Sequence, residues 1–270
     1  NVHTQYDSAL QHACMHNHFD IVKILIAHGA DVNAGCGYAL AMTISRTNNL
    51  VMAKYLLDHG ANIHENQDMA FREACSHGKL DAVKFLISHG ANIHANYDSA
   101  LGEACVNGHL DMVKFLVEHN ANIHYCDDLA LRNASIKGHL KIVKFLVESG
   151  ANVNAHDSWA LQCAINNDHF DVAKYLIKTG AQITVSMLRC SAFDGNLARV
   201  KFLAKHKCFS REDYDSALEY ALESNVVNDN SDMINFLTKQ RQNLNASVIC
   251  NVTKYLIKCA YKIINFNMFV

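Results

Sequence analysis

A single pattern that returns every 30 or 31 residues constrains what this chain can fold into more than any other feature. The tag Gly-Ala-Asx-Ile/Val-His/Asn begins at Gly29, Gly60, Gly90, Asn120 (with Asn in place of Gly), Gly150 and, more loosely, Gly180. A Val-Lys-Phe-Leu-type segment and an Ala-Leu or Ala-Phe pair recur in the same phase. Fixed periods of this length are typical of solenoids, in which each repeat buries its apolar face against its neighbours.

Each repeat is predicted to form two short helices and a loop. In residues 98–127, Asp98 can cap a first helix that ends at Gly108-His109, and Leu110 to Glu118 form a second helix with one apolar face. Asn120 then occupies the C′ position. The neighbouring repeats have Gly there, which adopts a positive φ without steric strain. Because helices this short cannot bury their apolar faces alone, neighbouring repeats must stack.

This pattern resembles the ankyrin repeat. The segments that carry the resemblance are Gly108-His109-Leu110-Asp111-Met112-Val113-Lys114-Phe115-Leu116-Val117 and Gly29-Ala30-Asp31-Val32-Asn33-Ala34. The resemblance covers about residues 1–240. It implies an all-α ankyrin-repeat solenoid of stacked helix-turn-helix units with short hairpin fingers. It also implies that a protein partner binds the concave face, which the finger tips and the exposed side of each first helix form.

The repeats depart from the family in two ways. They have 30 residues where the family has about 33, and the missing residues lie in the finger. The chain has no proline, and Ala stands where the family's Pro starts the first helix. Residues two positions earlier can cap the helix instead: Asp7, Asp68, Asp98, Asp128, Asp215 and Ser158. Such short, proline-free repeats resemble those of giant amoebal (mimivirus-type) viruses, which implies an intracellular viral protein that engages host proteins in the host cytoplasm.

The repeat array is expected to span residues 1–240 in about eight units, the first truncated at its finger and the last two irregular. Repeat two has one extra residue near Thr47-Asn48, and the eighth unit has about four extra near Asn225–Asn230. Residues 241–270 are interpreted as a degenerate C-terminal helical cap. Because the chain opens without Met in the middle of a repeat, we expect it to be a segment of a longer protein.

Charge and motif content exclude several classes of function. The formal net charge is -2 and the pI is about 6.8, so no global basic field attracts nucleic acid. The sequence contains no run of about 18 apolar residues, so it predicts no membrane span. The sequence has no Gly-rich phosphate loop, no HExxH motif and no nucleophile elbow. We therefore expect a monomer that is not an enzyme and that uses no small-molecule substrate, cofactor or metal.

Ten cysteines and 17 histidines keep a metal- or nucleic-acid-binding protein open as an alternative. His12 and His16 have the i, i+4 spacing of a chelating pair. Most histidines instead recur in columns, before the C′ residue, in the Gly-His turn and in the finger, which favours structural roles. Cys14, Cys75 and Cys105 share one first-helix position. Helices pack about 8–10 Å apart, too far for a disulfide, so these residues are predicted to be small buried thiols.

Two further columns of recurring residues lie on the second helices. One contains lysines that aspartates three residues earlier can pair with, which favours a solvated outer face over a phosphate-binding stripe. The other consists of the aromatic residues at 55, 85, 115, 145, 175, 202, 236 and 255, and we predict that it forms a ladder in the core.

Partner binding is expected at the positions that vary from repeat to repeat while the frame stays constant. The candidate residues on finger tips and inner helices are Gln5, Tyr6, Asn66, Gln67, Glu73, His77, Asn96, Tyr97, Glu103, Asn107, Cys126, Asp127, Asn133, Lys137, His156 and Asp157. Drift without selection remains an alternative. A narrower alternative is the substrate-binding part of a ubiquitin-ligase adaptor, because related viral ankyrin proteins can carry an F-box-like tail. F-box segments usually open with Leu-Pro, and this chain has no Pro.

Overall fold

The computed structural model describes residues 7–224 and 231–244. Within these residues every regular element is a helix, which confirms the predicted all-α repeat fold. The chain packs as two units, Asn1–Ala181 and Gln182–Val270. They are called unit 1 and unit 2 below, and each is described by itself.

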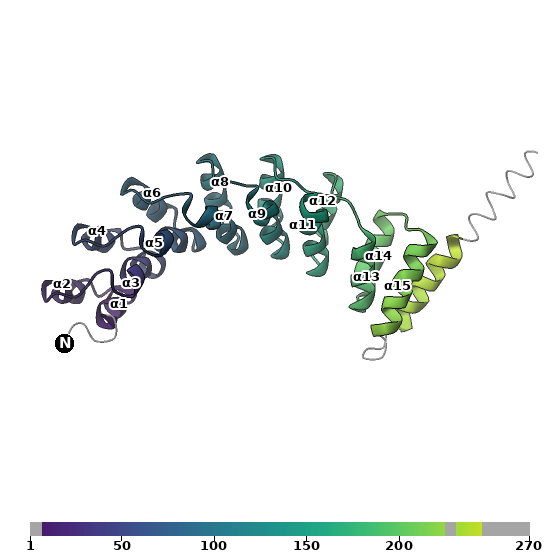
Figure 1. Ribbon diagram of the computed structural model, residues 1–270, viewed down its shortest axis with the longest axis horizontal. Coiled ribbons are helices and arrows are strands. Elements are labelled where there is room, and N and C mark those ends of the chain that lie inside the picture. The colour runs from purple at the N-terminus through teal and green to yellow at the C-terminus, as the bar shows by residue number, and fades with distance from the viewer. Residues whose placement is uncertain (1–6, 225–230, 245–270) are drawn as a thin grey trace, which may run out of the picture. The chain divides into compact units, whose positions relative to one another are not determined.

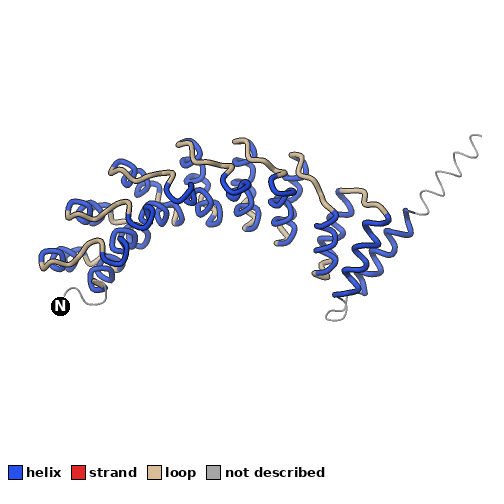
Figure 2. The backbone as a smooth tube through the Cα atoms, in the orientation of Figure 1, coloured by secondary structure: helices blue, strands red, loops and turns tan. Residues whose placement is uncertain are grey.

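The described part of unit 1 consists of six helix pairs in two layers (Figures 1 and 2). The first helices form one layer: α1 (Ser8–Met15), α3 (Ala34–Met42), α5 (Glu65–Ser76), α7 (Ala95–Asn107), α9 (Tyr125–Ile136) and α11 (Ala155–Asn166). The second helices form the other: α2 (Phe19–Ala27), α4 (Leu50–Asp58), α6 (Leu80–Ser88), α8 (Leu110–Glu118), α10 (Leu140–Glu148) and α12 (Phe170–Lys178). Helix α8 begins and ends where the sequence predicts.

Both layers bury apolar side chains between repeats. Helix α7 buries Ala100, Ala104 and Cys105 together with the larger Leu101, and the second helix of the same repeat buries Val113 and Leu116. The first helices pack in an unbroken row from α1 to α11, while the second helices contact one another more sparsely. Unit 1 therefore curves toward its first layer (Figure 1), which places the first helices on the inner side.

An extra residue in repeat two is accommodated by a π-helical turn. Helix η1 (Thr43–Thr47) continues directly from α3, and Asn48 ends it with a φ of 52°. A π-turn spans one residue more than an α-turn, so it absorbs a single insertion without shifting the next helix. The extra residue predicted near Thr47-Asn48 is thus confirmed.

Turns between the two helices of a repeat depend on a glycine and on a histidine from the next repeat. Gly108 follows α7 with a φ of 80°. The ring of His139 lies so close that a Cβ on Gly108 would be 2.8 Å from its Cε1 atom. His139 Nε2 donates to the carbonyl of Val106 at 3.1 Å, and His169 Nε2 donates to Ile136 at 3.0 Å. These histidines therefore connect neighbouring repeats, as the structural role predicted for this column implies.

A second histidine column lies at the ends of the second helices. His89 Nδ1 donates to the carbonyl of Phe85 at 2.8 Å, and the two ring centroids are 4.2 Å apart. The same pairing recurs at Tyr55–His59, Phe115–His119 and Phe202–His206. The prediction of an aromatic core ladder was wrong, because the described members of that column are only half-buried. Its residue 255 lies outside the described residues.

Unit 2 contains α13 (Val185–Phe193), α14 (Leu197–His206), α15 (Arg211–Ser224) and a further helix over residues 231–244. The hydroxyl of Thr184 accepts the N–H of Met187 at 3.4 Å and starts α13 directly, without the longer finger of the earlier repeats. The insertion predicted near residues 225–230 lies outside the described residues, as does the cap beyond residue 244. The boundary at residue 240 stays a prediction.

Burial changes the acidity of the cysteine column in the first layer. Cys14, Cys75 and Cys105 are buried free thiols, as predicted. Burial raises the pKa of Cys14 to about 11 and also raises the pKa of Cys75 and Cys105. The folded state therefore holds protons that the unfolded chain releases above a pH of about 8.5.

We expect the free energy of unfolding to fall as the pH rises from 8 to 11. The contribution of these thiols is fully present below the unfolded pKa and is lost as the pH rises toward the folded pKa. Urea unfolding at each pH measures the fall, and Cys75→Ala with Cys105→Ala should make it smaller. Alkylation of the native protein at pH 8 should modify the exposed thiols of Cys36, Cys126, Cys190 and Cys208 before that of Cys75. Equally fast modification of Cys75 would contradict the assignment.

Replacement of Gly108 by Ala should destabilise the protein more than the same change at Gly90. Both residues have positive φ, 80° and 99°, so both variants bear a backbone cost of about 1 kcal/mol. Only Gly108→Ala also forces its Cβ against His139, for about 1–3 kcal/mol more. Urea unfolding measures the difference, which His139→Ala should remove. Equal costs at both glycines would show that the histidine contact is not formed.

Candidate partner-binding surface

Each finger of repeats three to six contains three consecutive residues with positive φ. In repeat three, Asn66, Gln67 and Asp68 have φ values of 48°, 56° and 56°. The next repeats place residues 96–98, 126–128 and 156–158 in the same conformation. Residues other than glycine adopt this left-handed backbone at a cost of about 1–2 kcal/mol each. The fingers therefore need side-chain bonds that hold them in place.

Arginines of the first helices hold two of these turns. Arg72 donates from Nε to the carbonyl of Gln67 at 3.2 Å and from Nη2 to the carbonyl of Asn66 at 3.1 Å. Arg132 donates from Nη2 to the carbonyl of Cys126 at 3.3 Å. These bonds satisfy carbonyl groups that the left-handed turn leaves without a helical partner.

The aspartates predicted to cap the first helices bond to other groups, so that prediction was wrong. Asp68 is buried and accepts hydrogen bonds from His64 Nδ1 at 3.1 Å and from the N–H of Asn92 in the next repeat at 2.9 Å. The other finger pairs are Asp128 with His124 at 3.2 Å and with the N–H of Asn152 at 3.0 Å, and Asp98 with His94 at 2.8 Å. With a left-handed backbone, the carboxylate reaches the neighbouring finger rather than the start of its own helix.

Where the finger histidine is replaced by Asn, the amide side chain connects the repeats. Asn33 accepts the N–H of Asn62 at 2.7 Å through Oδ1 and donates from Nδ2 to the carbonyl of Gly60 at 2.9 Å. Asn154 donates in the same way to the carbonyl of Gly180 at 3.1 Å. Asn62 and Asn92 are equivalent residues of two fingers. The backbone N–H at this position therefore donates to the aspartate of a His-Asp pair in one finger and to a single Asn in the other.

The remaining predicted caps also have other roles. Asp7 has a φ of 54° and makes no capping bond through its side chain. The hydroxyl of Ser158 donates to Asn154 Oδ1 at 2.8 Å. Asp215 lies inside α15 and pairs with Arg211 at 3.8 Å.

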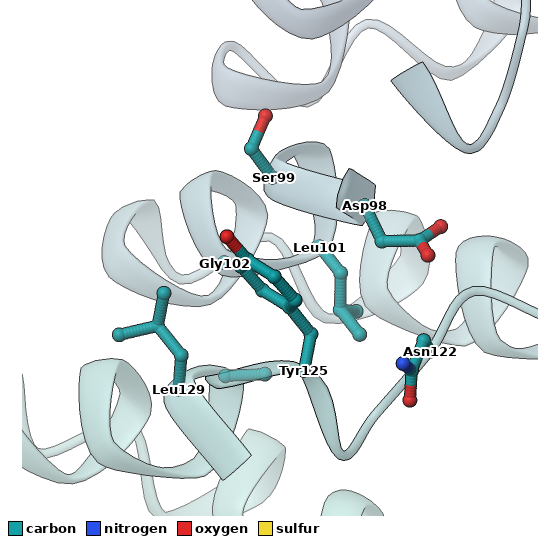
Figure 3. Close-up of a pocket in the computed structure, with 8 residues that line it drawn as sticks. Asp98, Ser99, Leu101, Gly102, Asn122, Tyr125 and Leu129 are labelled. Carbon is teal, nitrogen blue, oxygen red and sulfur yellow. The ribbon is translucent and has the colours of Figure 1, made fainter. Parts of the chain in front are cut away.

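Two stacked tyrosines mark the fingers of repeats four and five. Tyr97 is 73% exposed, and its ring centroid lies 5.9 Å from that of Tyr125 with 2° between the ring planes. Figure 3 shows the Tyr125 ring extending beside Gly102 and Leu129. The repeats on either side have Arg at the position of Gly102. The missing side chain therefore leaves a shallow depression that the tyrosine partly fills.

Trp159 continues this aromatic surface into repeat six. It is 41% exposed, and its ring centroid lies 4.6 Å from that of His156. The guanidinium carbon of Arg132 lies 4.3 Å from the tryptophan centroid, which is a cation–π contact. Arg132 thus connects the finger of repeat five to the tryptophan of repeat six.

Several predicted residues meet on the inner helices α5 and α7. Glu103 pairs with Arg72 at 3.5 Å, and Asn107 donates to the hydroxyl of Ser76 at 3.1 Å. Burial raises the pKa of the Glu103 carboxyl; Arg72 opposes that rise, and Glu73 adds to it. These contacts bring side chains from two repeats into one polar patch on the inner helices.

The other candidate residues divide into three groups. Those in local contacts are His77 with Glu73 at 3.6 Å, Asn96 with Ser99 at 3.2 Å, Asn133 with the Gly102 carbonyl at 3.2 Å, and Asp127 with His156 at 3.8 Å. Those that are exposed include Asn66, Gln67, Cys126, Lys137 and Asp157. Those outside the described residues are Gln5 and Tyr6.

Sequence reasoning missed four residues of this surface, Arg72, Tyr125, Arg132 and Trp159. Tryptophan, tyrosine and arginine are the residue types enriched at binding hot spots. Trp159 is the single tryptophan of the chain. That bias in residue type is the signal that could have found them.

Histidine and cysteine side chains are the usual ligands of a protein zinc site. Within residues 7–224 and 231–244, no group of three or more His, Cys, Asp or Glu side chains is arranged to hold a metal ion. His12 Nδ1 bonds to the carbonyl of Ser8 at 2.8 Å.

Among residues 7–224 and 231–244, no helix has the length and apolar character needed to cross a membrane.

Comparison with protein families agrees with this geometry. The family model described as "Ankyrin repeats (3 copies)" matches residues 1–67, 42–127, 71–157 and 123–187, which together cover more than half of the chain. The chain belongs to the ankyrin-repeat family. Ankyrin repeats generally mediate protein–protein interactions. A search of curated proteins finds no sequence that matches the chain.

Loss of the Asp68 side chain should destabilise the ankyrin array by about 1–3 kcal/mol, because Asp68→Ala leaves the N–H of Asn92 and the His64 imidazole without their acceptor. Asp20→Ala is the matched control, since the Asp20 side chain is 93% exposed and pairs with Lys23 on the same helix. Urea unfolding midpoints compare the two variants. If the two variants unfold at the same urea concentration, the hydrogen bond from Asn92 to Asp68 does not connect the two fingers.

Proposed function

We propose that this ankyrin-repeat protein is a non-catalytic scaffold that binds a protein partner through the fingers and inner helices of repeats three to six. The observation that carries the proposal is the surface formed by Tyr97, Tyr125, Arg132 and Trp159 on successive repeats. Hot spots of protein interfaces are enriched in these residue types. The rings of Tyr and Trp supply large contact areas with little loss of conformational entropy. The polar patch around Glu103 would form part of the rim.

The fixed geometry of the fingers supports this function. Bonds from Arg72 and Asp68 hold the left-handed turn of repeat three before any partner arrives. A surface that is already ordered loses less entropy on binding, so more of the contact energy appears as affinity. The variable residues therefore project from a frame that stays the same from repeat to repeat.

The resemblance to short repeats of giant amoebal viruses narrows the proposal. The partner is then a host protein in the host cytoplasm, bound by a monomer of this chain. Crosslinking mass spectrometry of the tagged full-length protein in its host tests both the partner and the surface. The crosslinks should map to the fingers and inner helices of repeats three to six.

Tyr97→Ala combined with Trp159→Ala should weaken partner binding by about 10- to 100-fold, because two hot-spot side chains are removed. Val51→Ala on α4 is the control, since Val51 is 69% exposed and lies in the other layer. Titration with the crosslinked partner measures the affinity, and circular dichroism checks that each variant folds. Unchanged affinity of the double variant, with crosslinks on the second helices, would refute the assignment.

A further inference from the structure

Charge is distributed unevenly between the two layers of repeats three to six. The first helices α5, α7, α9 and α11, together with Lys137 after α9, contain eight acidic and three basic residues. The second helices α6, α8, α10 and α12 contain five acidic and six basic residues. A partner that approaches the inner side therefore meets a negative surface, and surfaces of opposite charge attract each other during association.

The two arginines of these first helices already have partners within the protein. Arg72 pairs with Glu103 at 3.5 Å, and Arg132 lies over the ring of Trp159 at 4.3 Å. Burial raises the pKa of the Glu103 carboxyl; Arg72 opposes that rise, and Glu73 adds to it. The carboxylates of Glu73 and Glu103 therefore repel each other, and a cation from a partner would relieve the repulsion.

Two carboxylates at the finger tips are open to solvent. Asp127 and Asp157 occupy the same position in the fingers of repeats five and six, and both are exposed. Asp127 Oδ2 lies 3.8 Å from His156 Nδ1. Asp157 makes no ion pair or side-chain hydrogen bond with the residues that the structure describes. Both side chains are free to pair with a cation outside the protein.

Aromatic rings lie close to these carboxylates. His156, which contacts Asp127, also has its ring centroid 4.6 Å from that of Trp159. The Trp159 ring already accommodates the guanidinium of Arg132. Tyr97, on the finger of repeat four, is 73% exposed. Cations are attracted to the faces of Trp and Tyr rings, and guanidinium groups form paired hydrogen bonds with carboxylates.

We propose that the partner segment bound by this surface is a basic peptide whose arginine side chains pair with Asp127 and Asp157 and stack on Trp159 and Tyr97. This inference rests on the proposed function, to which it adds the chemistry of the partner. Arginine fits better than lysine, because its planar guanidinium both stacks on aromatic rings and pairs with carboxylates through two hydrogen bonds. Nucleic acid and other polyanions would be repelled from the same surface.

The spacing of the repeats sets the spacing of the arginines. Neighbouring helices pack about 8–10 Å apart, so the equivalent tips of fingers five and six are separated by about this distance. A peptide in the polyproline II conformation has three residues per turn and rises about 3.1 Å per residue. Side chains three residues apart therefore project in the same direction, about 9 Å from one another. The peptide that fits has arginine at every third position.

The test uses the full chain and synthetic peptides that contain no tryptophan, with the fluorescence of Trp159 as the signal. The first peptide has arginine at every third position and Ala or Ser elsewhere. A second has Gln in place of each arginine, and a third has the same composition as the first with its arginines adjacent. We expect the first peptide to shift the emission to shorter wavelength in a saturable way. It should bind about tenfold more tightly than the Gln peptide and severalfold more tightly than the third.

Asp127→Asn combined with Asp157→Asn should weaken binding of the first peptide by about 3- to 10-fold, because two ion pairs are lost. Asp81→Asn combined with Asp111→Asn is the matched control. It removes the same charge from exposed residues of the second helices α6 and α8 and should leave the affinity unchanged. Circular dichroism checks that both variants fold.

Three outcomes would overturn the inference: no saturable shift with the first peptide, equal binding of the first peptide and either comparison peptide, or equal weakening by the two pairs of Asp→Asn changes. Failure of the proposed function gives a different result, because the crosslinked partner itself would then bind without changing the Trp159 emission. A partner that covers Trp159 through a segment without basic residues would leave the proposed function standing and contradict only this inference.

Discussion

The packing of first helices through alanine and cysteine side chains is the contact on which the rest of unit 1 depends. Ala100, Ala104 and Cys105 are buried beside Leu101, and the first helices contact one another more densely than the second helices do. The unit curves toward its first layer (Figure 1). That curvature places the fingers and inner helices of successive repeats on one continuous face.

Shortening of the finger sets the second constraint. With three residues fewer than the usual repeat length, the chain enters the first helices of repeats three to six through a left-handed turn, which is costly for residues other than glycine. Arg72 and Arg132 bond to the turn carbonyls, and Asp68, Asp128 or Asn33 bonds to the backbone of the next finger. The bonds that stabilise the turns also fix the residues beside them, such as Gln67 and Cys126.

The sequence alone predicts the helices and turns of the repeat well, because the spacing of apolar residues shows which face of each helix points inward. The repeat spacing located α8 to the residue, and the C′ residues from Gly29 to Gly180 have positive φ as expected. Periodicity does not report depth, however. The aromatic column recurs in phase but lies half-buried, and a histidine four residues later packs on several of its rings.

The roles of the aspartates could not be predicted for a different reason. An Asp two residues before an apolar run is a common helix cap, and only the positive φ of Asp68 directs its carboxylate elsewhere. Variation between repeats found Tyr97 and His156 as candidates. It did not single out Trp159, although the residues at the same position of the neighbouring repeats, Ser99 and Leu129, differ from it.

Fluorescence of the single tryptophan tests the central claim most directly, namely that a rigid frame presents Trp159 and its neighbours for partner binding. Trp159 is partly exposed beside Arg132 and His156, so a partner that covers it removes water from the indole. Titration with a partner that contains no tryptophan should shift the emission to shorter wavelength, saturating with the same midpoint as binding. Saturated binding with unchanged emission would contradict the account.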